Sequence, residues 1–573
     1  MDKVLKFIWC HREDNWLWLG VICITCSIVM LAFPVMGVPE GYDIAQHLRF
    51  AAAYREAMLD GSLIPLWSSV ENLGFGSVGI RFYPPFADYL LGITQLFAND
   101  WYETLSLNSF FWMFPGCIGV YFWVKEIRSS MTAAVAAMFY ALFPYHLLQV
   151  YLFQLYAEFV ASAILPFCFL FATRLIRRGR PADTLGLALS CSLLVLTHIP
   201  SSMIGLGSLS IYAGCLIDWK NPKFAIKKLA IAASITIGTT LFYLVRLLTE
   251  LDWVKHSADQ FSTGFYDHGR HLFPLLYNFG DLYWQRLLWI LDLTIIFTAV
   301  ALIPLSYCVV RLGKFAFFEK FEWKMIVGIT LTGLFSFFML SMLSGFVWNT
   351  FTALQKTQFP WRFLSVGSLM GVVALSVAVP TLLENYSRFS RLIVYPVVML
   401  IFVISLFDLT QVILMAGQLP RAKFYELVVD KRSDQACSCW WPVWAEGKAL
   451  DDRQLIAAND RNVSISSWEP ADRAFTVGNG DPMDLRVATF YYPYWKATVN
   501  GKPTQVKMDE NGVILIPVSS EASTVRLYFE EPFINRVALW FSLLTWAGVL
   551  VVIGVYLKNR ILQAGPTPTL SNM

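Results

Sequence analysis

Asp43 and His47 stand four residues apart, just past the first membrane-length apolar segment of this 573-residue chain. Side chains at this spacing lie on one side of a helical turn, so the carboxylate and the imidazole can share a substrate or a metal ion. A carboxylate placed in this way can accept a proton from a reacting hydroxyl group. The same pattern is also typical of a solvated helix start that is capped by its aspartate. The rest of the chain must decide between these two interpretations.

Further ionisable residues occur where a membrane protein seldom carries them. Arg49 and Arg81 belong to the same polar loop as Asp43, and Glu158 stands in an otherwise apolar segment. Ionisable groups at membrane depth mark functional sites by default, although Glu158 could equally pair with an arginine or reach the interface. His146 and His198 each lie beside a proline at the end of an apolar segment. For these two histidines, a helix-end cap is the alternative to a role in a site.

Arg362 lies among aromatic residues in Gln358-Phe-Pro-Trp-Arg-Phe363, at the end of another apolar segment. A guanidinium group can hold a phosphate through two parallel hydrogen bonds, while aromatic neighbours line a groove for an acyl chain. An anchor at the membrane interface, where Trp and Arg are both common, explains the residue types equally well. No Gly-rich phosphate loop and no zinc-spaced His/Cys set accompanies it. A divalent metal is left open, because Asp43, His47 and the loop histidines supply ligand types without ligand spacing.

The composition places these residues in a membrane protein. The chain is 56% hydrophobic and only 15% charged, its mean hydropathy is +0.53, and an ordinary soluble protein carries roughly 25% charged residues. A net charge of +3 is too small to indicate nucleic acid as a partner. Apolar runs of about 20 residues recur along the chain and predict a polytopic α-helical membrane protein.

Twelve apolar segments are long enough to be predicted as membrane spans. They cover residues 16–36, 106–124, 131–148, 157–174, 184–198, 203–217, 229–247, 287–310, 326–348, 364–382, 392–413 and 535–557. If these segments alternate, every cluster of Lys and Arg falls on one side, which the positive-inside rule assigns to the cytoplasm. We therefore expect both termini to be cytoplasmic. Residues 86–97 are apolar but break this alternation, so we expect a short re-entrant or interfacial helix there, with a full span as the alternative.

Residues 417–532 have a different character from the membrane segments. Charged residues are denser there, apolar runs are shorter, and alternating patterns typical of strands occur near 462–467, 485–490 and 524–529. Asn500-Gly501, between two such runs, is a strong hairpin signal, and Asn511-Gly512 marks a second turn. The sequence therefore predicts a membrane domain over 1–416, with a first outer loop at 37–103. An extracytoplasmic β domain over 417–532 and a final helix with a short tail over 533–573 follow it.

The ten cysteines show no metal-ligand spacing, and most lie in or beside apolar segments. There a cysteine acts as a small apolar side chain. Only Cys437 and Cys439 fall in a long polar region. A disulfide between partners two residues apart is unfavourable in geometry, so we expect no structural disulfide network.

Several short blocks, taken in order, resemble a known class of enzyme. Asp-x-x-x-His after the first span, Pro65-Leu-Trp67 and Phe82-Tyr-Pro-Pro-Phe86 resemble the first outer loop of a GT-C-type membrane glycosyltransferase. Phe143-Pro-Tyr-His146, Ala157-Glu158, Leu196-Thr-His-Ile-Pro200 and residues 358–363 resemble bacterial membrane proteins labelled as related to 6-pyruvoyl-tetrahydropterin synthase. Residues 490–503 are similar to the outer β domain of related multispan proteins.

This resemblance implies a polyprenyl-phosphate-linked sugar donor, an active site on the outer face and an acidic base in the first loop. Only Asp43 matches that base by position. Many such enzymes have Asp-Glu there, whereas this chain has Asp43-Ile44, and we expect His47 to take the second role. Together, the resemblance and the residues predict a polyprenyl-phosphate-dependent glycosyltransferase of a bacterial inner membrane, acting on a glycan, lipid or protein acceptor. The expected substrate-binding residues are Arg49, Arg81, Tyr83, His146, Glu158, His198, Gln358, Trp361 and Arg362.

Two other classes of protein are weighed against this one. A transporter or flippase of lipid-linked glycans also carries buried charges and many spans, but it predicts matched interrupted helices in repeated halves, and no such self-similarity is evident. A non-catalytic envelope assembly protein needs no cluster of acids and histidines on one face. The sequence leaves open the sugar, the acceptor and the oligomeric state.

Overall fold

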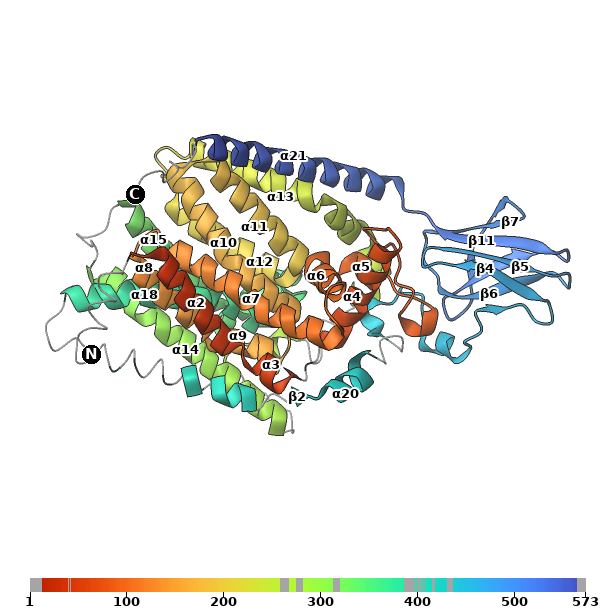
Figure 1. Ribbon diagram of the computed structural model, residues 1–573, viewed down its shortest axis with the longest axis horizontal. Helices are drawn as coiled ribbons and strands as arrows, with labels where there is room; N and C mark the ends of the chain where they lie inside the picture. Colours follow the sequence, from red (N-terminus) through yellow and green to blue (C-terminus); the bar gives the residue numbers. More distant parts are fainter. Residues whose placement is uncertain are drawn as a thin grey trace, which may run out of the picture.

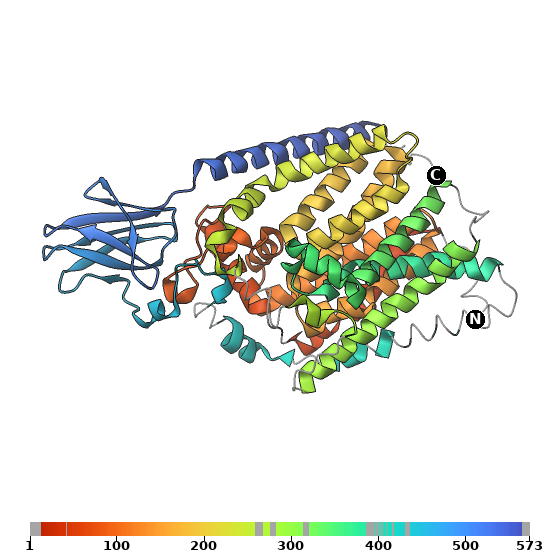
Figure 2. The ribbon, with the colours of Figure 1, turned by 180° about the vertical axis from the view of Figure 1, so that it is seen from behind.

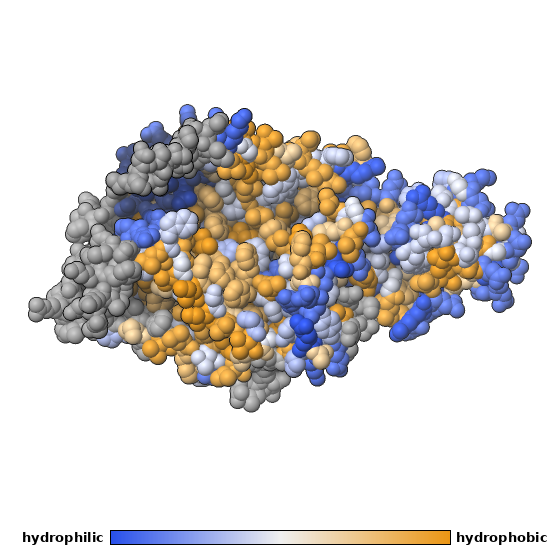
Figure 3. All heavy atoms as spheres, in the orientation of Figure 1, coloured by the Kyte–Doolittle hydropathy of each residue, from blue (hydrophilic) through white to orange (hydrophobic). Residues whose placement is uncertain are grey.

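The computed structural model describes residues 13–39, 41, 43–257, 267–274, 282–312, 320–385, 418–429 and 436–563, together with 396, 399, 403, 405–407 and 409–414. Figure 1 shows an elongated molecule with a bundle of helices at one end of the long axis and a β domain at the other. In Figure 3, hydrophobic side chains cover much of the bundle, while hydrophilic side chains gather on the β domain.

The bundle consists of long apolar helices and a few short ones. They are α2 (Asn15–Val29), α3 (Ala32–Met36), α7 (Trp101–Val124), α8 (Ser130–Ala141), α9 (Pro144–Leu147), η2 (Leu148–Leu152), α10 (Tyr156–Arg178), α11 (Pro181–Thr197), α12 (Ile199–Leu216), α13 (Lys223–Glu250), α14 (Leu282–Leu312), α15 (Lys320–Leu340), α18 (Leu364–Asn385) and α21 (Phe533–Gln563). Within the described residues, nine helices are long and apolar enough to cross a membrane, and the bent pair Ser130–Ala141 and Pro144–Leu152 can supply a tenth span. The chain is therefore a polytopic α-helical membrane protein, as predicted.

Most of the predicted spans coincide with these helices, although the predicted number of spans is higher than the number of membrane-length helices. Ten of the twelve predicted segments fall on the nine helices and the bent pair. The segment 184–198 falls on α11, which is a shorter apolar helix of 17 residues. Half of the segment 392–413 lies outside the described residues. Ser405–Leu414, which overlaps its second half, is a shorter apolar helix.

Residues 86–97, which broke the predicted alternation of spans, fall mostly on a short helix in the first loop. α6 (Pro85–Gln95) has 11 residues, a length of about 16 Å at 1.5 Å per residue, whereas the hydrocarbon core is about 30 Å thick. It is therefore too short to be a full span. Pro85 begins the helix at a position where a missing backbone N–H costs little. Asp88 and Leu91 are buried within the protein, and α6 packs on α4 (Ile44–Leu59), which follows Asp43.

The β domain contains two antiparallel sheets within residues 456–529, inside the predicted 417–532. One sheet has the order β3-β6-β10-β9 and the other β4-β5-β11-β7-β8. The strands are β3 (Ile456–Ala457), β4 (Val463–Trp468), β5 (Asp472–Val477), β6 (Met483–Phe490), β7 (Trp495–Val499), β8 (Lys502–Thr504), β9 (Lys507–Met508), β10 (Val513–Val518) and β11 (Ser523–Phe529). Both predicted turns are confirmed. Asn500-Gly501 joins β7 to β8 with positive φ at both residues, and Gly512 precedes β10.

The β domain packs directly against the first loop. One buried cluster contains Trp67 and Phe75 of the loop together with Trp495 and Phe490 of the domain. The rings of Trp67 and Trp495 lie 5.3 Å apart, and the backbone N–H of Phe490 donates to the carbonyl oxygen of Phe75 at 3.0 Å. A second tie lies at the loop's start, where β1 (Val38–Pro39) pairs with β2 (Gln418–Leu419). The loop is therefore held between the membrane helices and the β domain.

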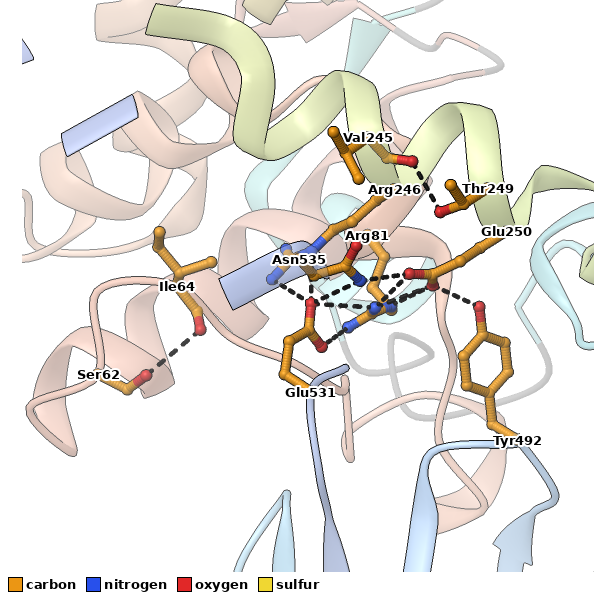
Figure 4. A network of polar contacts seen from close by, with 10 residues as sticks. All are labelled: Ser62, Ile64, Arg81, Val245, Arg246, Thr249, Glu250, Tyr492, Glu531 and Asn535. Carbon is orange, nitrogen blue, oxygen red and sulfur yellow. Dashed lines mark hydrogen bonds and ion pairs between the residues drawn. The ribbon is translucent and has the colours of Figure 1, made fainter. Parts of the chain in front are cut away.

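A buried ion cluster joins the loop, the bundle and the β domain (Figure 4). Arg81, on α5 (Gly79–Phe82), lies 2.9 Å from Glu250 at the end of α13 and 2.8 Å from Glu531, which follows β11. Arg246 also contacts Glu531, at 2.8 Å. The Tyr492 hydroxyl of the β domain donates to Glu250 at 2.7 Å. α21, which begins just after Glu531, then runs along α13 to the far end of the bundle (Figures 1 and 2).

We predict that Arg81→Met destabilises the whole protein. Removing one partner of a buried ion cluster leaves carboxylates without full compensation, so the free energy of unfolding should fall by about 3–5 kcal/mol. Thermal unfolding in detergent measures this change. Arg526→Met is the matched control, because Arg526 pairs with Asp472 on the exposed surface of the β domain, where ion pairs contribute little. Equal losses of stability in the two variants would contradict the role assigned to the cluster.

Candidate active site

A cavity of about 750 Å³ lies where the first loop meets the bundle and the segment that precedes the β domain. Its polar lining residues come from α4 and the residue before it, from the link between α5 and α6, from the start of α12, from the loop before α14 and from the stretch around η9 (Pro360–Phe363). They are Asp43, Gln46, His47, Arg49, Tyr83, His198, His256, Lys356, Gln358 and Arg362. Residues distant in sequence thus form one pocket. The remaining lining residues are mostly apolar or aromatic.

Asp43 occupies the N-cap position of α4 but does not cap the helix. Its backbone carbonyl oxygen accepts from the N–H groups of Gln46 and His47 at 3.1 and 3.2 Å, while its side chain makes no capping hydrogen bond. The residue is exposed to the cavity. The helix-cap alternative is therefore not what the structure shows, and the carboxylate faces space that a ligand can fill.

His47 is held by a buried carboxylate from α6. Its Nδ1 lies 2.7 Å from Oδ1 of Asp88, and both side chains are almost fully buried. Burial disfavours the imidazolium, but the nearby Asp88 carboxylate outweighs this effect and raises the pKa of His47 above its usual value. The edges of the Tyr83 and Tyr156 rings also contact the imidazole. The short helix after Pro84 therefore fixes the orientation of His47.

Arg362 is held from behind by Glu158. Its Nε lies 3.1 Å from Oε2 of Glu158, without the alignment of a hydrogen bond, and its Nη1 donates to the carbonyl oxygen of Thr357 at 2.8 Å. The other Glu158 oxygen accepts from the Tyr145 hydroxyl, and from Nε2 of Gln149 at 3.1 Å. These bonds fix Glu158, and Glu158 in turn orients the guanidinium that faces the cavity.

The permanent positive charges of the cavity come from Arg49, Lys356 and Arg362. The two histidines beside them are neutral at pH 7. Burial lowers the pKa of His256 to about 4, helped by Lys356 and Arg362. Burial and Arg362 likewise hold the pKa of His198 well below its usual value. Nδ1 of His198 accepts the backbone N–H of Ser201 at 3.3 Å.

An aromatic and disulfide-linked segment forms one wall. Trp440, in η12 (Ser438–Trp440), stacks on the His256 ring at 4.6 Å between centroids and contacts Tyr83 at 5.8 Å. Cys437 and Cys439 also line the cavity and are bonded to each other. The sequence spacing predicts that a disulfide between these two cysteines is unfavourable, whereas the structure contains this disulfide. The tight turn of η12 brings their Cα atoms within 5.2 Å, a separation that a disulfide can bridge.

The structure brings most of the predicted site residues together. Asp43, His47, Arg49, Tyr83, His198, Gln358, Trp361 and Arg362 all line the cavity. Gln358 adopts a left-handed backbone conformation with φ +67°, which is uncommon for a residue with a side chain. Glu158 and His146 lie behind the residues that line the cavity. His146 is buried, with Nδ1 3.3 Å from the amide oxygen of Gln149. Arg81 lies in the ion cluster and not in the lining.

Three residues of the site received no role from the sequence. Asp88 stands on the short apolar helix, and no local pattern connects it to His47, 41 residues earlier. Its charge within an apolar run is the one signal that could have identified it. Lys356 and His256 lie in polar loops, where charged residues are ordinary. Only the tertiary fold places them beside Arg362.

Metal ligation was left open by the sequence. Within the part of the chain that the structure describes, no three His, Cys, Asp or Glu side chains converge in a way that could hold a metal ion. Asp43 and His47 both face the cavity, but Nδ1 of His47 is bound to Asp88.

Comparison with known proteins gives one family and several similar folds. A model of the family described as "6-pyruvoyl-tetrahydropterin synthase related domain; membrane protein" matches residues 80–416. No curated protein matches the chain. The oligosaccharyltransferase of Archaeoglobus fulgidus in the apo form has 13% identity and a TM-score of 0.44, over 75% of this chain and 59% of its own.

Two further solved structures are similar to a comparable degree. ArnT from Cupriavidus metallidurans bound to undecaprenyl phosphate has 13% identity and a TM-score of 0.40, over 65% of this chain and 61% of its own. The arabinofuranosyltransferase AftD from Mycobacteria has 15% identity and a TM-score of 0.43, over 70% of this chain and 28% of its own. The chain thus spans 59% and 61% of the lengths of the oligosaccharyltransferase and ArnT.

We predict that Asp88→Asn destabilises the protein more at pH 6 than at pH 9. Because Asp88 raises the pKa of His47, the ion pair contributes fully below the unfolded-histidine pKa of about 6.5 and is lost as the pH rises through the higher folded value. The difference in melting temperature between wild type and variant should therefore shrink from pH 6 to pH 9. Asp484→Asn is the control, since its partner Lys507 is a lysine and not a histidine. A constant or growing difference for Asp88→Asn would contradict the pairing.

Proposed function

The chain belongs to the family of membrane proteins described as the 6-pyruvoyl-tetrahydropterin synthase related domain, and we propose that it is a polyprenyl-phosphate-dependent glycosyltransferase. The family description does not specify this chemistry. The proposal rests on the cavity, which presents Asp43, three cationic side chains and a largely apolar wall to one ligand-sized space. A lipid-linked sugar phosphate contains the three matching parts: a polar sugar, an anion and a long apolar chain.

The arrangement of charged side chains around the cavity favours an anionic ligand. Arg49, Lys356 and Arg362 line the space, whereas Glu158 lies behind Arg362 and Glu71 lies behind Arg49 and Gln46. Glu158 therefore orients Arg362, and Glu71 interacts electrostatically with Arg49, without either carboxylate lining the cavity. Guanidinium groups held in this way suit phosphate, whose oxygens accept two parallel hydrogen bonds.

In the proposed reaction, an acceptor hydroxyl attacks the anomeric carbon of the sugar while its proton passes to the Asp43 carboxylate. A bond forms between the acceptor oxygen and the anomeric carbon, and the bond from that carbon to the donor phosphate oxygen breaks. The electron pair leaves with the polyprenyl phosphate, which gains one negative charge. Displacement in line inverts the anomeric centre. Arg362, Lys356 and Arg49 stabilise the added charge, and electrostatic stabilisation of this kind is usually the largest single contribution to catalysis.

His47 and the apolar wall complete the assignment. His47 follows Asp43 by one turn, and Asp88 orients it so that Nε2 is the ring nitrogen left for the acceptor or the carboxylate. The isoprenoid part of the donor would lie against the apolar lining. These residues are Phe82, Pro84, Phe153, Leu155, Ile199, Pro200, Tyr243, Leu247, Leu251, Phe359 and Trp361.

We place the reaction on the outer face of a bacterial inner membrane, with the β domain on the same side. The positive-inside pattern of the loops supports this orientation, and the cavity lies at the end of the bundle that carries the β domain. The acceptor, which can be a glycan, a lipid or a protein, would enter beside η12 and the β domain. The sugar is open.

Asp43→Asn is predicted to lower kcat by about 10²–10⁴-fold, because the amide cannot accept the acceptor proton. The melting temperature should change little, since Asp43 does not cap its helix. The assay measures transfer from a panel of polyprenyl-phosphate sugars to membrane glycolipid extracts. Asp252→Asn is the control, an exposed acid of the same outer region that does not line the cavity.

Two results of this assay would reject the mechanism. Equal turnover by wild type and Asp43→Asn would remove Asp43 as the base. No turnover with any donor, from a folded wild-type protein, would favour a carrier of lipid-linked glycans or a scaffold instead.

Lys356→Gln is predicted to raise the KM for the donor about tenfold, since a hydrogen bond to a charged group contributes about 1.5–3 kcal/mol and 1.4 kcal/mol is tenfold in affinity. The effect should shrink as the salt concentration rises. Lys423→Gln, an exposed lysine on α20 (Arg421–Phe424) outside the cavity, controls for net charge. An unchanged KM in Lys356→Gln would place the donor phosphate elsewhere.

A further inference from the structure

A second, smaller cavity lies at the other end of the bundle from the β domain. It has a volume of about 360 Å³ and is lined by Phe122, Lys125, Glu126, Arg174, Arg177 and Arg178. Two candidate spans end here, α7 at Val124 and α10 at Arg178. The cavity therefore lies at the level where helices leave the hydrocarbon core and lipid head groups begin.

Three arginines of α10 converge on one nearly buried carboxylate. Nε of Arg174 lies 2.7 Å from Oε1 of Glu126, and Nη2 of Arg178 lies 2.6 Å from Oε2. Nη1 of Arg177 donates to the backbone carbonyl oxygen of Glu126 at 3.1 Å. The Glu126 side chain is only 4% exposed, whereas the three arginine side chains are 25–35% exposed. The carboxylate thus fixes the guanidinium groups while leaving part of each one accessible.

The charges of this cavity do not balance. Four cationic side chains line it against one carboxylate, so an excess of three positive charges remains. Asp183, just outside the lining, interacts with Arg174, Arg178 and Arg180. Counting Asp183 together with Arg180 leaves the excess of positive charge unchanged. The guanidinium of Arg177 also lies over the Phe321 ring of α15, 5.5 Å from its centroid, which holds a third helix at the same site.

An anion with an apolar part fits this combination of features. Preoriented guanidinium groups match phosphate oxygens, and Phe122, on the last turns of a membrane-length helix, offers an apolar wall that continues toward the hydrocarbon core. Basic pockets between membrane helices bind the head groups of anionic lipids. A soluble inorganic phosphate would use the same guanidinium groups but not the apolar wall.

We propose that this cavity binds the phosphate head group of an anionic phospholipid. The site is separate from the candidate active site and does not depend on the function proposed for it. Glu126 acts as the anchor of the site, since its ion pairs hold Arg174 and Arg178 in place. The bound lipid would join α7, α10 and α15 at the membrane surface opposite the β domain.

The test compares lipid binding by the full-length protein in detergent, using native mass spectrometry with phosphatidylglycerol and phosphatidylcholine. Lys125→Gln combined with Arg177→Gln removes two charges but keeps both close pairs of Glu126. Each basic residue near a membrane surface contributes about fivefold to the binding of anionic lipid, so the Kd for phosphatidylglycerol should rise about 25-fold. If the double variant does not fold, Lys125→Gln alone should raise the Kd about fivefold.

Lys223→Gln combined with Lys227→Gln is the matched control. Both lysines are exposed on α13 at the same end of the bundle, near Gly179, which contacts Phe224. This control should retain the affinity of the wild type. If both double variants bind phosphatidylglycerol equally weakly, the binding depends on the overall positive charge of this surface and not on the cavity, and the proposed site would be overturned. Equal affinity for phosphatidylcholine, or displacement of the lipid by a similar concentration of inorganic phosphate, would overturn the assignment to an anionic lipid.

Discussion

A buried charge near a membrane is tolerated only where an opposite charge and hydrogen bonds compensate it, and this constraint organises the structure. Arg81 is satisfied by Glu250 and Glu531, and Arg362 is held by Glu158. His47 is paired with Asp88. Each pair joins segments distant in sequence, so the pairs fix the fold and the site together. Asp43 differs from them, because it faces the cavity and does not cap its helix.

The first loop carries members of two of these sets, the His47–Asp88 pair and the Arg81 cluster. α4 carries Asp43 and His47, α6 supplies Asp88, and α5 supplies Arg81, which lies in the cluster that anchors the β domain. The segment with Trp440 then closes one wall of the cavity. A change in how the β domain docks would therefore alter the geometry of the cavity. The loop contains α4, α5 and α6, and its contacts with both the bundle and the β domain hold it in one conformation.

Much of this architecture could be predicted from local patterns. Apolar length located ten of the twelve predicted spans on membrane-length helices or on the bent pair, and Asn500-Gly501 identified its hairpin, since few residues adopt positive φ readily. Most candidate site residues also reached one cavity. Local patterns did not pair Asp88 with His47, because that contact depends on how α6 packs on α4. For the same reason, the sequence could not distinguish the roles of Arg81 and Arg362. Arg81 is paired with buried carboxylates, whereas Arg362 faces the cavity.

The proposed function requires that the cavity beside Asp43 binds the phosphate of a polyprenyl-linked donor. A cryo-electron-microscopy map of the protein in lipid nanodiscs with an added polyprenyl phosphate tests it most directly. We expect phosphate density within hydrogen-bonding distance of Arg362 and of Lys356 or Arg49, with the isoprenoid chain following the apolar wall past Phe359. A cavity that stays without lipid density at saturating ligand, or phosphate bound at another site, would contradict it.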